Sequence, residues 1–399
     1  MIQAFQVAAP ILAKIEEAGF EAYFVGGSVR DYLLNKDIHD VDIATSATPL
    51  EIKSIFPKTI DVGIEHGTVV VLYENQSYEI TTFRSESDYE DFRRPAEVQF
   101  IRSLIEDLQR RDFTINAIAM NRNGDIIDPF NGRDALERRM IATVGIAKER
   151  FNEDALRMMR AVRFVSQLSF SIESSTFSAL SDYGGLLREI AIERISTEFE
   201  KLLKGTNRKQ ALQILLETEI YKYLPGFDTK KDKLQMFVDL SDSNLKVEEL
   251  WVLLIYKLNL AKKDIEPFLK AWKLSMKTIK GIEKIFSWLE YRMNHEWTLE
   301  SMYYAKIDSI FSTEKLYNVL TGQGNPNNLD DLKQEYESLP IKERNEMDIT
   351  GTDLMEWFQL AGGPWVKEKL ESIEKAIIIG EIENRKETIR EWLMRCNLS

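Results

Sequence analysis

The chain has 399 residues, 44% of them hydrophobic and 29% charged, which is typical of a globular protein with several domains. Its net charge of −13 argues against a protein that coats nucleic acid, because a polyanion needs a basic face. The single cysteine, Cys396, excludes a disulfide framework and fits the cytoplasm. No apolar run approaches the roughly 18 residues of a membrane span, so no membrane partner is expected.

The first twenty residues predict an amphipathic helix with Glu16 and Glu17 on it, not a signal peptide. From there to about residue 145, strand and helix patterns alternate, which predicts an α+β domain. The predicted strands are Ala22–Gly26, Val41–Ala44, Thr68–Tyr73, Tyr78–Phe83, Val98–Ile101 and Ala117–Asn121, and the predicted helices are Ser28–Leu34, Pro49–Phe56 and Leu104–Arg110. The four residues 74–77 between two of these strands predict a hairpin.

The stretch from Tyr23 to Thr45 carries the chemistry around which this domain is organised. Gly26 and Gly27 form a tight turn before a helix, where exposed backbone N–H groups suit phosphate, and Arg30 adds a guanidinium one turn later. Asp40 and Asp42 are predicted on one face of the next strand, about 7 Å apart. Two such carboxylates repel each other unless a cation lies between them, and oxygen ligands suit Mg²⁺.

Each feature alone has an ordinary explanation. A Gly-Gly pair is usually a turn, and an Asp-x-Asp pair is usually a polar strand edge. The combination of a phosphate cradle with a metal pair is much more specific, because it is what nucleotidyl transfer between two metal ions requires.

This combination resembles the signature of the nucleotidyltransferase superfamily that includes polymerase beta. In detail it is similar to class II tRNA nucleotidyltransferases, the CCA-adding enzymes, and to bacterial poly(A) polymerases. The resemblance implies a small polymerase-beta-like nucleotidyltransferase sheet domain, followed by an all-helical neck, body and tail. It also implies Glu79, on the strand Tyr78–Phe83, as a third catalytic carboxylate, although a surface strand residue would look the same.

Two further segments of this domain match the family. Residues 110–117, RRDFTINA, match its second motif, which implies that Arg111 contacts the triphosphate and that Asp112 and Asn116 order the backbone or the ribose. Residues 128–136, DPFNGRDAL, match the motif that connects head to neck, where turn chemistry is a sufficient explanation.

The segment Arg84–Pro95 is polar, charged and without apolar periodicity, which predicts a long mobile loop. In the resembled family a flexible loop at this place helps the enzyme to switch from adding C to adding A. Arg84, Arg93 and Arg94 in this segment therefore favour addition of the complete CCA sequence over addition of C alone.

The segment Phe151–Phe164 predicts a helix that Asn152 caps. It lies within a stretch, 148–164, that has a local charge balance of +2. Asp154, Arg157, Arg160 and Arg163 follow one another at intervals of three, so Asp154 and Arg157 are neighbours on the helix surface. The spacing by itself favours an exposed salt bridge.

The chemistry of the bases supports a second interpretation of this helix. Cytosine and adenine each present an amino donor beside a ring acceptor, which a carboxylate and a guanidinium satisfy together. Uracil and guanine would leave mismatched groups, each costing roughly 1–3 kcal/mol. In the resembled family this motif selects the base, which implies that role for Glu153, Asp154 and Arg157. Arg160 and Arg163 would then meet the triphosphate or the tRNA end.

A further family motif, residues 191–198, implies that Glu193, Arg194 and Glu198 brace this helix. Beyond about Lys204 the apolar positions recur at helical spacing and strand signals vanish. All seven tryptophans lie in this part, where they are expected to be core residues more often than stacking platforms. This part is therefore predicted to be entirely helical.

The predicted division is head 1–147, neck 148–205, body 206–300 and a tRNA-binding tail 301–399. The resemblance implies template-independent addition of C, C and A to the tRNA 3′ end from CTP and ATP, with Mg²⁺ as cofactor. Poly(A) polymerase and a CC-adding enzyme are the alternatives, and a non-catalytic RNA-binding protein on the same scaffold is a remote one. Both a monomer and a homodimer remain open.

Overall fold

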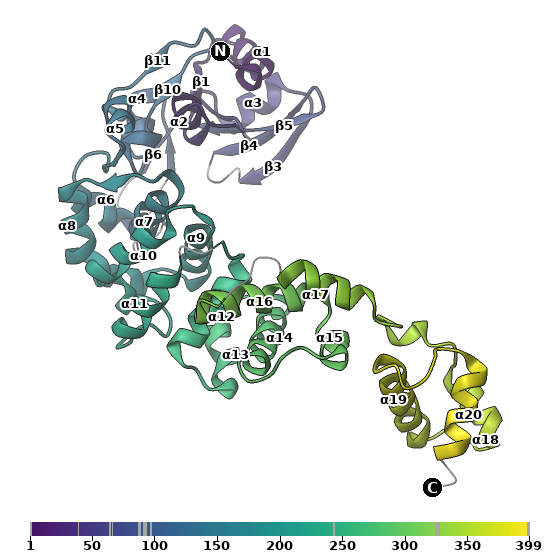
Figure 1. Ribbon diagram of the computed structural model, residues 1–399. Helices are drawn as coiled ribbons and strands as arrows, with labels where there is room; N and C mark the ends of the chain where they lie inside the picture. Colours follow the sequence, from purple (N-terminus) through teal and green to yellow (C-terminus); the bar gives the residue numbers. More distant parts are fainter. Residues whose placement is uncertain are drawn as a thin grey trace. The chain divides into compact units, whose positions relative to one another are not determined.

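A computed structural model describes residues 2–38, 40–63, 65, 67–86, 89–90, 94–95, 98–241, 244–323 and 328–396, with the backbone alone at 86, 89–90, 94–95, 98, 328 and 396. The chain forms two compact units (Figure 1). The first unit comprises Met1–Asp242 and Phe268–Leu274, and the second comprises Ser243–Pro267 and Ser275–Ser399. The predicted α+β fold class is confirmed, since the sheet lies in the first unit and helices make up the second.

The first unit contains a seven-stranded sheet in the order β11-β10-β1-β2-β5-β4-β3. Its neighbours are antiparallel except for β2 and β5, which run parallel. The strands are β1 (Ala22–Val25), β2 (Asp42–Thr45), β3 (Thr59–Gly63), β4 (Thr68–Tyr73), β5 (Gln76–Thr82), β10 (Ala119–Met120) and β11 (Ile126–Ile127).

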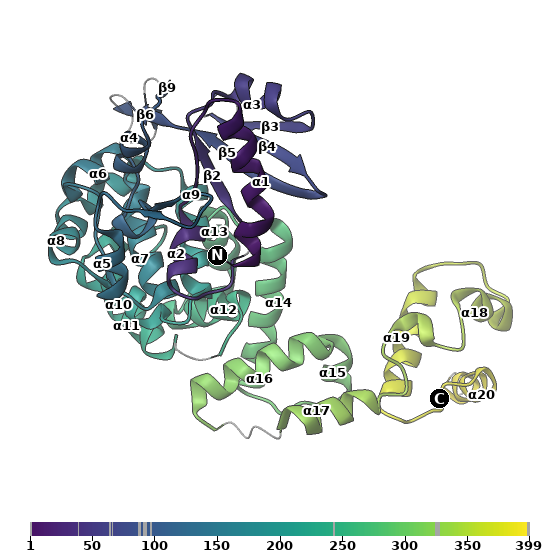
Figure 2. The same cartoon turned by 90° about the horizontal axis from the view of Figure 1, so that it is seen from above.

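The two faces of this sheet differ in character. Phe24, Ile43, Ile80 and Val69 pair in register across four strands, and all four are buried. This face packs against α1 (Gln3–Glu17) and α3 (Pro49–Ile55), which Figure 2 shows from above, and Phe5 of α1 contacts the ring of Phe24. Because side chains alternate along a strand, the residues that precede Ile43 and Ile80 project from the opposite face.

All six predicted strands occur within a few residues of their expected ends, and β4 has the expected bounds. The predicted hairpin is confirmed, but β4 and β5 are joined by two residues, Glu74 and Asn75, not by four. Both have positive φ, 49° and 62°, which matches the right-handed twist of the strands that they connect. The edge strand β3 and the short β11 were not predicted, because neither segment has a strong strand pattern.

The segment Arg84–Pro95, which was predicted to be a long mobile loop, contains short paired strands among the residues that the structure describes. β6 (Arg84–Glu86) pairs with β9 (Val98–Phe100), and β7 (Tyr89–Glu90) pairs with β8 (Arg94–Pro95). Backbone pairing between polar strands leaves no apolar alternation in the sequence, so the pattern could not reveal it. Arg93 lies outside the described residues.

The rest of the first unit is mainly helical. A short parallel pair, β12 (Met140–Ile141) with β13 (Ser171–Ile172), places one strand in the neck that was predicted to be all helical. The helices are α2 (Gly27–Leu33), α4 (Leu104–Gln109), α5 (Gly132–Glu137), α6 (Ala147–Glu153), α7 (Leu156–Leu168), α8 (Ser174–Tyr183), α9 (Ile192–Lys204), α10 (Arg208–Glu217) and α11 (Lys231–Leu240).

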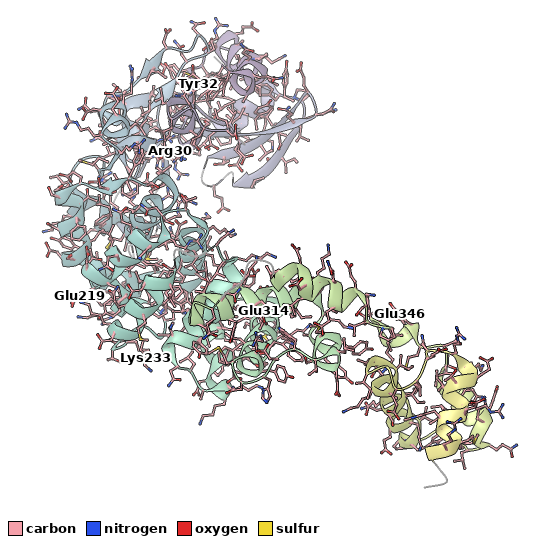
Figure 3. All side chains as sticks on the ribbon, in the orientation of Figure 1. Arg30, Tyr32, Glu219, Lys233, Glu314 and Glu346 are labelled. Atoms are coloured by element: carbon pink, nitrogen blue, oxygen red, sulfur yellow. The ribbon has the colours of Figure 1, made fainter. Side chains whose placement is uncertain are left out.

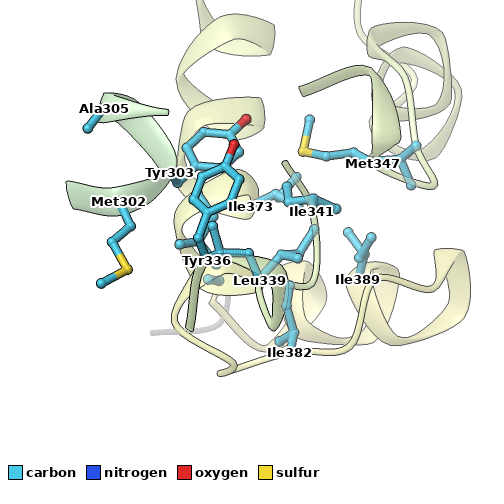
Figure 4. Packing of buried hydrophobic residues seen from close by; sticks show 14 of the residues in the cluster. Met302, Tyr303, Ala305, Tyr336, Leu339, Ile341, Met347, Ile373, Ile382 and Ile389 are labelled. Atoms are coloured by element: carbon cyan, nitrogen blue, oxygen red, sulfur yellow. The ribbon is translucent and has the colours of Figure 1, made fainter. Parts of the chain in front are cut away.

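The second unit has no strand among its described residues, as predicted. Tyr303, Tyr336, Ile373 and Ile389 belong to one buried apolar cluster from several of its helices (Figure 4). Its helices are α12 (Val247–Leu258), α14 (Met276–Arg292), α15 (Leu299–Ala305), α16 (Ile307–Thr321), α17 (Asn328–Glu337), α18 (Gly351–Phe358), α19 (Pro364–Ile378) and α20 (Lys386–Cys396), while α13 (Lys262–Ala271) is divided between the units.

Buried charge in the second unit is paired. Glu314 is fully buried and accepts hydrogen bonds from Arg292 Nε at 2.6 Å and from Trp297 Nε1 at 2.7 Å. A buried carboxylate without such donors would be costly, so these contacts make Glu314 compatible with the core. The tryptophans behave as predicted here, since Trp251 is fully buried and Trp297 packs against the apolar cluster.

Candidate active site

Two carboxylates, Asp42 and Glu79, lie on the face of the sheet opposite α1 and α3. In the parallel pair β2–β5, Ile43 lies opposite Ile80, so Asp42 and Glu79 are level with each other, one residue earlier on each strand. Burial raises the pKa of Asp42, and the negative charges of Glu79 and Asp40 raise it further. A carboxylate with a raised pKa beside other carboxylates is a place where a cation would relieve repulsion.

Asp40 is near this pair but does not lie where it was predicted. The strand begins at Asp42, so Asp40 precedes it and is exposed, and the argument from strand alternation does not apply to it. Among the described residues, no three His, Cys, Asp or Glu side chains form a complete metal site. The donor set nevertheless fits Mg²⁺, which is usually held by one or two carboxylates together with water and substrate phosphates.

The glycine turn brings a guanidinium next to Asp42. Gly26 has a φ of +69°, and a Cβ at this residue would lie 3.3 Å from Arg111 Nη1 and 3.4 Å from Asp42 Oδ2. Both the backbone conformation and the space above it therefore favour glycine. A Cβ on Gly27 would lie 3.5 Å from Arg30 Nη2, so Arg30 extends over the second glycine.

Arg111 is held in this position by a residue that the sequence analysis missed. Asp107 is 1% exposed and forms ion pairs with Arg111 Nη2 at 3.1 Å and with Arg110 Nη2 at 2.6 Å. Burial tends to raise the pKa of Asp107, but the charges of Arg111 and Arg110 hold it below its ordinary value. The signal was available, because Asp107 lies three and four residues before the two arginines at the end of a predicted helix.

Arg30 is connected to the neck helix α7 by polar contacts. Its Nη1 donates to Asn116 Oδ1 at 2.7 Å, and its Nε donates to Asp31 Oδ1 at 2.9 Å. Asn116 in turn donates to Asp112 Oδ1 at 3.1 Å, and Asp112 Oδ2 accepts from Arg160 Nε at 2.7 Å. Figure 3 shows Arg30 on the side of the sheet domain that faces these helices.

An aromatic ring lies within this group of cations. The guanidinium carbons of Arg30, Arg160 and Arg163 lie 5.3, 5.7 and 4.1 Å from the centroid of the Phe164 ring. Phe164 is buried, and the sequence analysis did not assign it any role. Its position on α7, directly after Arg163 and four residues after Arg160, is the signal that could have identified it.

The predicted helix over Phe151–Phe164 is interrupted. α6 ends at Glu153 and α7 begins at Leu156, while Asp154 has extended backbone angles. Asn152 does not cap α7, because its Nδ2 donates to Lys148 O within α6. Asp154 precedes the N-cap residue Ala155, and its Oδ1 accepts from Leu156 N, the first residue of α7, at 3.0 Å.

The interruption changes the partners of the two residues that were predicted to be neighbours on one helix. Asp154 Oδ2 pairs with Arg194 Nη2 at 2.7 Å, while Arg157 pairs with Glu153. Arg157 is 6% exposed, and its Nη2 also donates to Arg110 O at 2.8 Å. The prediction that Asp154 and Arg157 share a helix surface is therefore wrong, since Asp154 precedes the helix.

The brace predicted for the motif at residues 191–198 is confirmed at two of its three residues. Arg194 contacts Asp154 as described, and Glu198 Oε2 lies 2.5 Å from Arg163 Nε on α7. Burial lowers the pKa of Arg163 despite this carboxylate. Glu193 forms an ion pair with Lys273 at 3.6 Å, and Lys273 lies outside α7.

The predicted site residues thus form three groups within the first unit. Asp42 lies beside Glu79 and also beside Arg111 at Gly26, while Arg30 joins Asn116, Asp112 and Arg160. Glu153 is the last residue of α6, Asp154 follows it, and Arg157 lies in the first turn of α7. In the part of the chain that the structure describes, no helix is both long and apolar enough to cross a membrane.

Comparison with known families accounts for most of the chain. The model of the poly A polymerase head domain matches residues 22–142, and that of an RNA-binding region of polymerase A matches residues 169–231. The model of tRNA nucleotidyltransferase domain 2 matches residues 243–393.

Individual relatives are similar over their full length. The CCA-adding enzyme of Bacillus cytotoxicus is 46% identical over 395 residues, 99% of each chain, and that of a Geobacillus species is 47% identical over 100% of this chain and 98% of its own. The crystal structure of the Bacillus stearothermophilus CCA-adding enzyme in complex with CTP is 44% identical, with a TM-score of 0.90 over 100% of this chain and 98% of that one. A tRNA nucleotidyltransferase complexed with a primer tRNA and an incoming ATP analog is 25% identical, with a TM-score of 0.62 over 82% and 97%.

Proposed function

Because the chain belongs to the family of CCA-adding enzymes, we propose that it adds C, C and A to the 3′ end of tRNA without a nucleic-acid template, using CTP and ATP. Similarity over the full length supports this function, since the relatives match both the sheet domain and the helical remainder. It also favours CCA addition over poly(A) synthesis, although the head-domain model carries a poly(A) polymerase name. The substrates imply action in the cytoplasm.

The observation that carries the proposal is the position of Asp42, which lies beside Glu79 and beside Arg111 at Gly26. Enzymes of this family are nucleotidyltransferases, which normally need a divalent metal ion. We assign Asp40 and Asp42 as the residues that would hold Mg²⁺, which would stabilise the negative charge that develops on the reacting phosphate.

The protein groups around Asp42 have separate roles in the reaction. The tRNA 3′-hydroxyl oxygen bonds to the α-phosphorus of the incoming nucleotide, and the bond from that phosphorus to the bridging oxygen breaks to release pyrophosphate. Glu79 accepts the hydroxyl proton, as its position beside Asp42 permits. Gly26 and Gly27 let the triphosphate approach the backbone, while Arg30 and Arg111 bind its oxygens.

Base selection is assigned to the segment between α6 and α7. Asp154 accepts from the amino group of cytosine or adenine, Arg157 donates to the adjacent ring acceptor, and Glu153 orients Arg157 through their ion pair. The extended backbone at Asp154 supports this assignment, because it separates the carboxylate from the helix surface. Arg160 and Arg163 are assigned to the triphosphate side.

The predicted four-part division remains a proposal, with the tail at residues 301–399 contacting tRNA.

The test of the proposed function is nucleotide incorporation on three primers: tRNA without CCA, tRNA ending in CC, and oligo(A). Each primer is incubated with CTP, ATP or both, and the products are resolved at single-nucleotide resolution. Two C and one A followed by a stop is the expected result. Open-ended A addition on oligo(A) would instead identify a poly(A) polymerase, and two C without A would identify a CC-adding enzyme.

A further inference from the structure

Asp112 has no hydrogen-bonding capacity left for a nucleotide. An ionised carboxylate has about four lone-pair sites. Oδ1 of Asp112 accepts from Phe113 N at 2.8 Å and from Asn116 Nδ2 at 3.1 Å, and Oδ2 lies 2.7 Å from Arg160 Nε and 2.5 Å from Arg160 Nη2. The residue is 7% exposed. Both oxygens of Asp112 therefore accept hydrogen bonds from the protein. They do not bind the ribose, which the sequence analysis gave as a possible partner of Asp112.

Asn116 uses both ends of its amide in the same chain of contacts. Its Oδ1 accepts from Arg30 Nη1 at 2.7 Å, and its Nδ2 donates to Asp112 Oδ1. The hydrogen bonds therefore run from Arg30 through Asn116 to Asp112, where they meet the donors of Arg160. The ends of the chain are Arg30 on α2 and Arg160 on α7, which are 130 positions apart in the numbering but lie beside the same Phe164 ring.

We propose that Asn116 and Asp112 are positioning residues that fix Arg30 and Arg160 relative to each other, so that the two guanidinium groups bind the triphosphate as one preorganised unit. This inference rests on the proposed function. Each guanidinium has five N–H donors, and the contacts to Asp31, Asn116 and Asp112 leave some of them for phosphate oxygens. Buried, fully satisfied hydrogen-bond networks of this kind hold their members in one geometry.

Charge supports the same arrangement. Two guanidinium groups placed beside one ring would repel each other without a carboxylate between them. Although burial acts against it, the Arg160 guanidinium and the Asn116 amide lower the pKa of Asp112 to about 2, so the carboxylate is ionised at neutral pH. Asp112 pairs with Arg160 and Asp31 pairs with Arg30, so each guanidinium has one carboxylate partner and the two can lie beside the same ring.

The polarity of the contacts suggests two substitutions that each break the relay of hydrogen bonds from Arg30 to Arg160. Asn116→Asp keeps an acceptor for Arg30 but removes the donor to Asp112, and it places two carboxylates side by side. Asp112→Asn keeps Oδ1 as the acceptor for Phe113 N and Asn116 Nδ2, but it presents an amide N–H₂ group to Arg160 in place of Oδ2. Because both substitutions break the same relay, their effects on nucleotide binding should not add in the double variant.

The measurements are the Kd for CTP and ATP without tRNA, the KM and kcat with tRNA, and the melting temperature. Asn116→Asp and Asp112→Asn should each raise Kd and KM for both nucleotides at least about tenfold, with kcat changed less than about threefold, and the double variant should bind about as well as the worse of the two single variants. Asn121→Asp is the matched control, because Asn121 donates to Asp125 four residues later in an exposed turn at 2.9 Å. It should leave all constants unchanged.

Two results would overturn the proposal. One is unchanged nucleotide binding in Asn116→Asp, and the other is a double variant whose loss of binding equals the product of the two single losses, because independent effects multiply. A purely structural role would lower the melting temperature without the split between KM and kcat. Failure of the wild-type chain to add CCA would count against the proposed function instead. Measuring CTP binding directly distinguishes that failure from a failure of the relay.

Discussion

Replacing Arg194 should reduce base discrimination although Arg194 is not assigned to contact the base. Its Nη2 lies 2.7 Å from Asp154 Oδ2, while the other oxygen of Asp154 accepts from Leu156 N. Arg194→Gln removes the charge-assisted contact and leaves Asp154 fixed through one oxygen. Asp154 can then rotate or accept a water, so its preference for an amino donor over a carbonyl oxygen should weaken.

The magnitude follows from the geometry of the pair. Hydrogen bonds to charged groups contribute about 1.5–3 kcal/mol. The Arg194 and Asp154 side chains are 29% and 19% exposed, so solvent screening reduces the contribution to about 1–2 kcal/mol. If all of this energy contributes to the discrimination between CTP and UTP, the ratio of kcat/KM for CTP to kcat/KM for UTP should fall about 5- to 30-fold.

The assay is steady-state incorporation of the first nucleotide on tRNA without CCA, with CTP and UTP measured separately. Arg188→Gln is the control, since Arg188 is an exposed arginine whose guanidinium lies 4.8 Å from the Tyr223 ring centroid in the same unit. An unchanged CTP to UTP ratio in Arg194→Gln, or an equal loss with both nucleotides, would refute the reasoning.

Four other outcomes are expected. Asp112→Asn should lower the free energy of unfolding by about 2 kcal/mol at pH 7, because the pKa of Asp112 falls from 3.8 to about 2 on folding. This stabilisation is present above pH 4 and is lost toward pH 2, so urea titrations should show about half the difference in unfolding free energy at pH 3. A difference that does not change with pH would contradict this linkage. Glu79→Gln should lower kcat about 100-fold in rapid-quench assays with little change in the KM for CTP, and an unchanged kcat would exclude Glu79 as the base. Gly26→Ala, at a φ of +69° and with its Cβ 3.3 Å from Arg111 Nη1, should raise the KM for both nucleotides, and wild-type kinetics would show that the turn tolerates a side chain. Shortening residues 85–93 should spare C addition and depress A addition on sequencing gels, whereas equal loss of both would separate this segment from the switch.

Local patterns in the sequence predicted the elements well wherever neighbouring residues decide the structure. The alternation in residues 68–83 predicted the hairpin, and the Gly26–Gly27 turn before Arg30 predicted the start of α2. The segment Arg84–Pro95 shows the limit of this method, because its short polar strands are defined by backbone partners and not by their own composition.

At the site, the residues and their chemistry were readable from the sequence, whereas their partners were not. Asp154 and Arg157 were identified by the chemistry of the bases and by the family motif, but a break between α6 and α7 gives Arg194 to one and Glu153 to the other as partners. A pattern of i and i+3 assumes one continuous helix, and no local rule predicts that Asp154 will instead precede the helix while a residue 40 positions later supplies its second contact.

The sequence by itself determined the fold class, the family resemblance and the residue types available for metal, phosphate and base, because these depend on periodicity and short motifs. Only the tertiary structure decided that Glu79 lies beside Asp42, which requires the parallel pairing of β2 with β5. It also decided that Arg30 reaches Asn116, 86 positions away, and through it Asp112 and Arg160. The physical reason is that such contacts are fixed by how sheets and helices pack, a choice made by the whole chain and not by any short stretch of it.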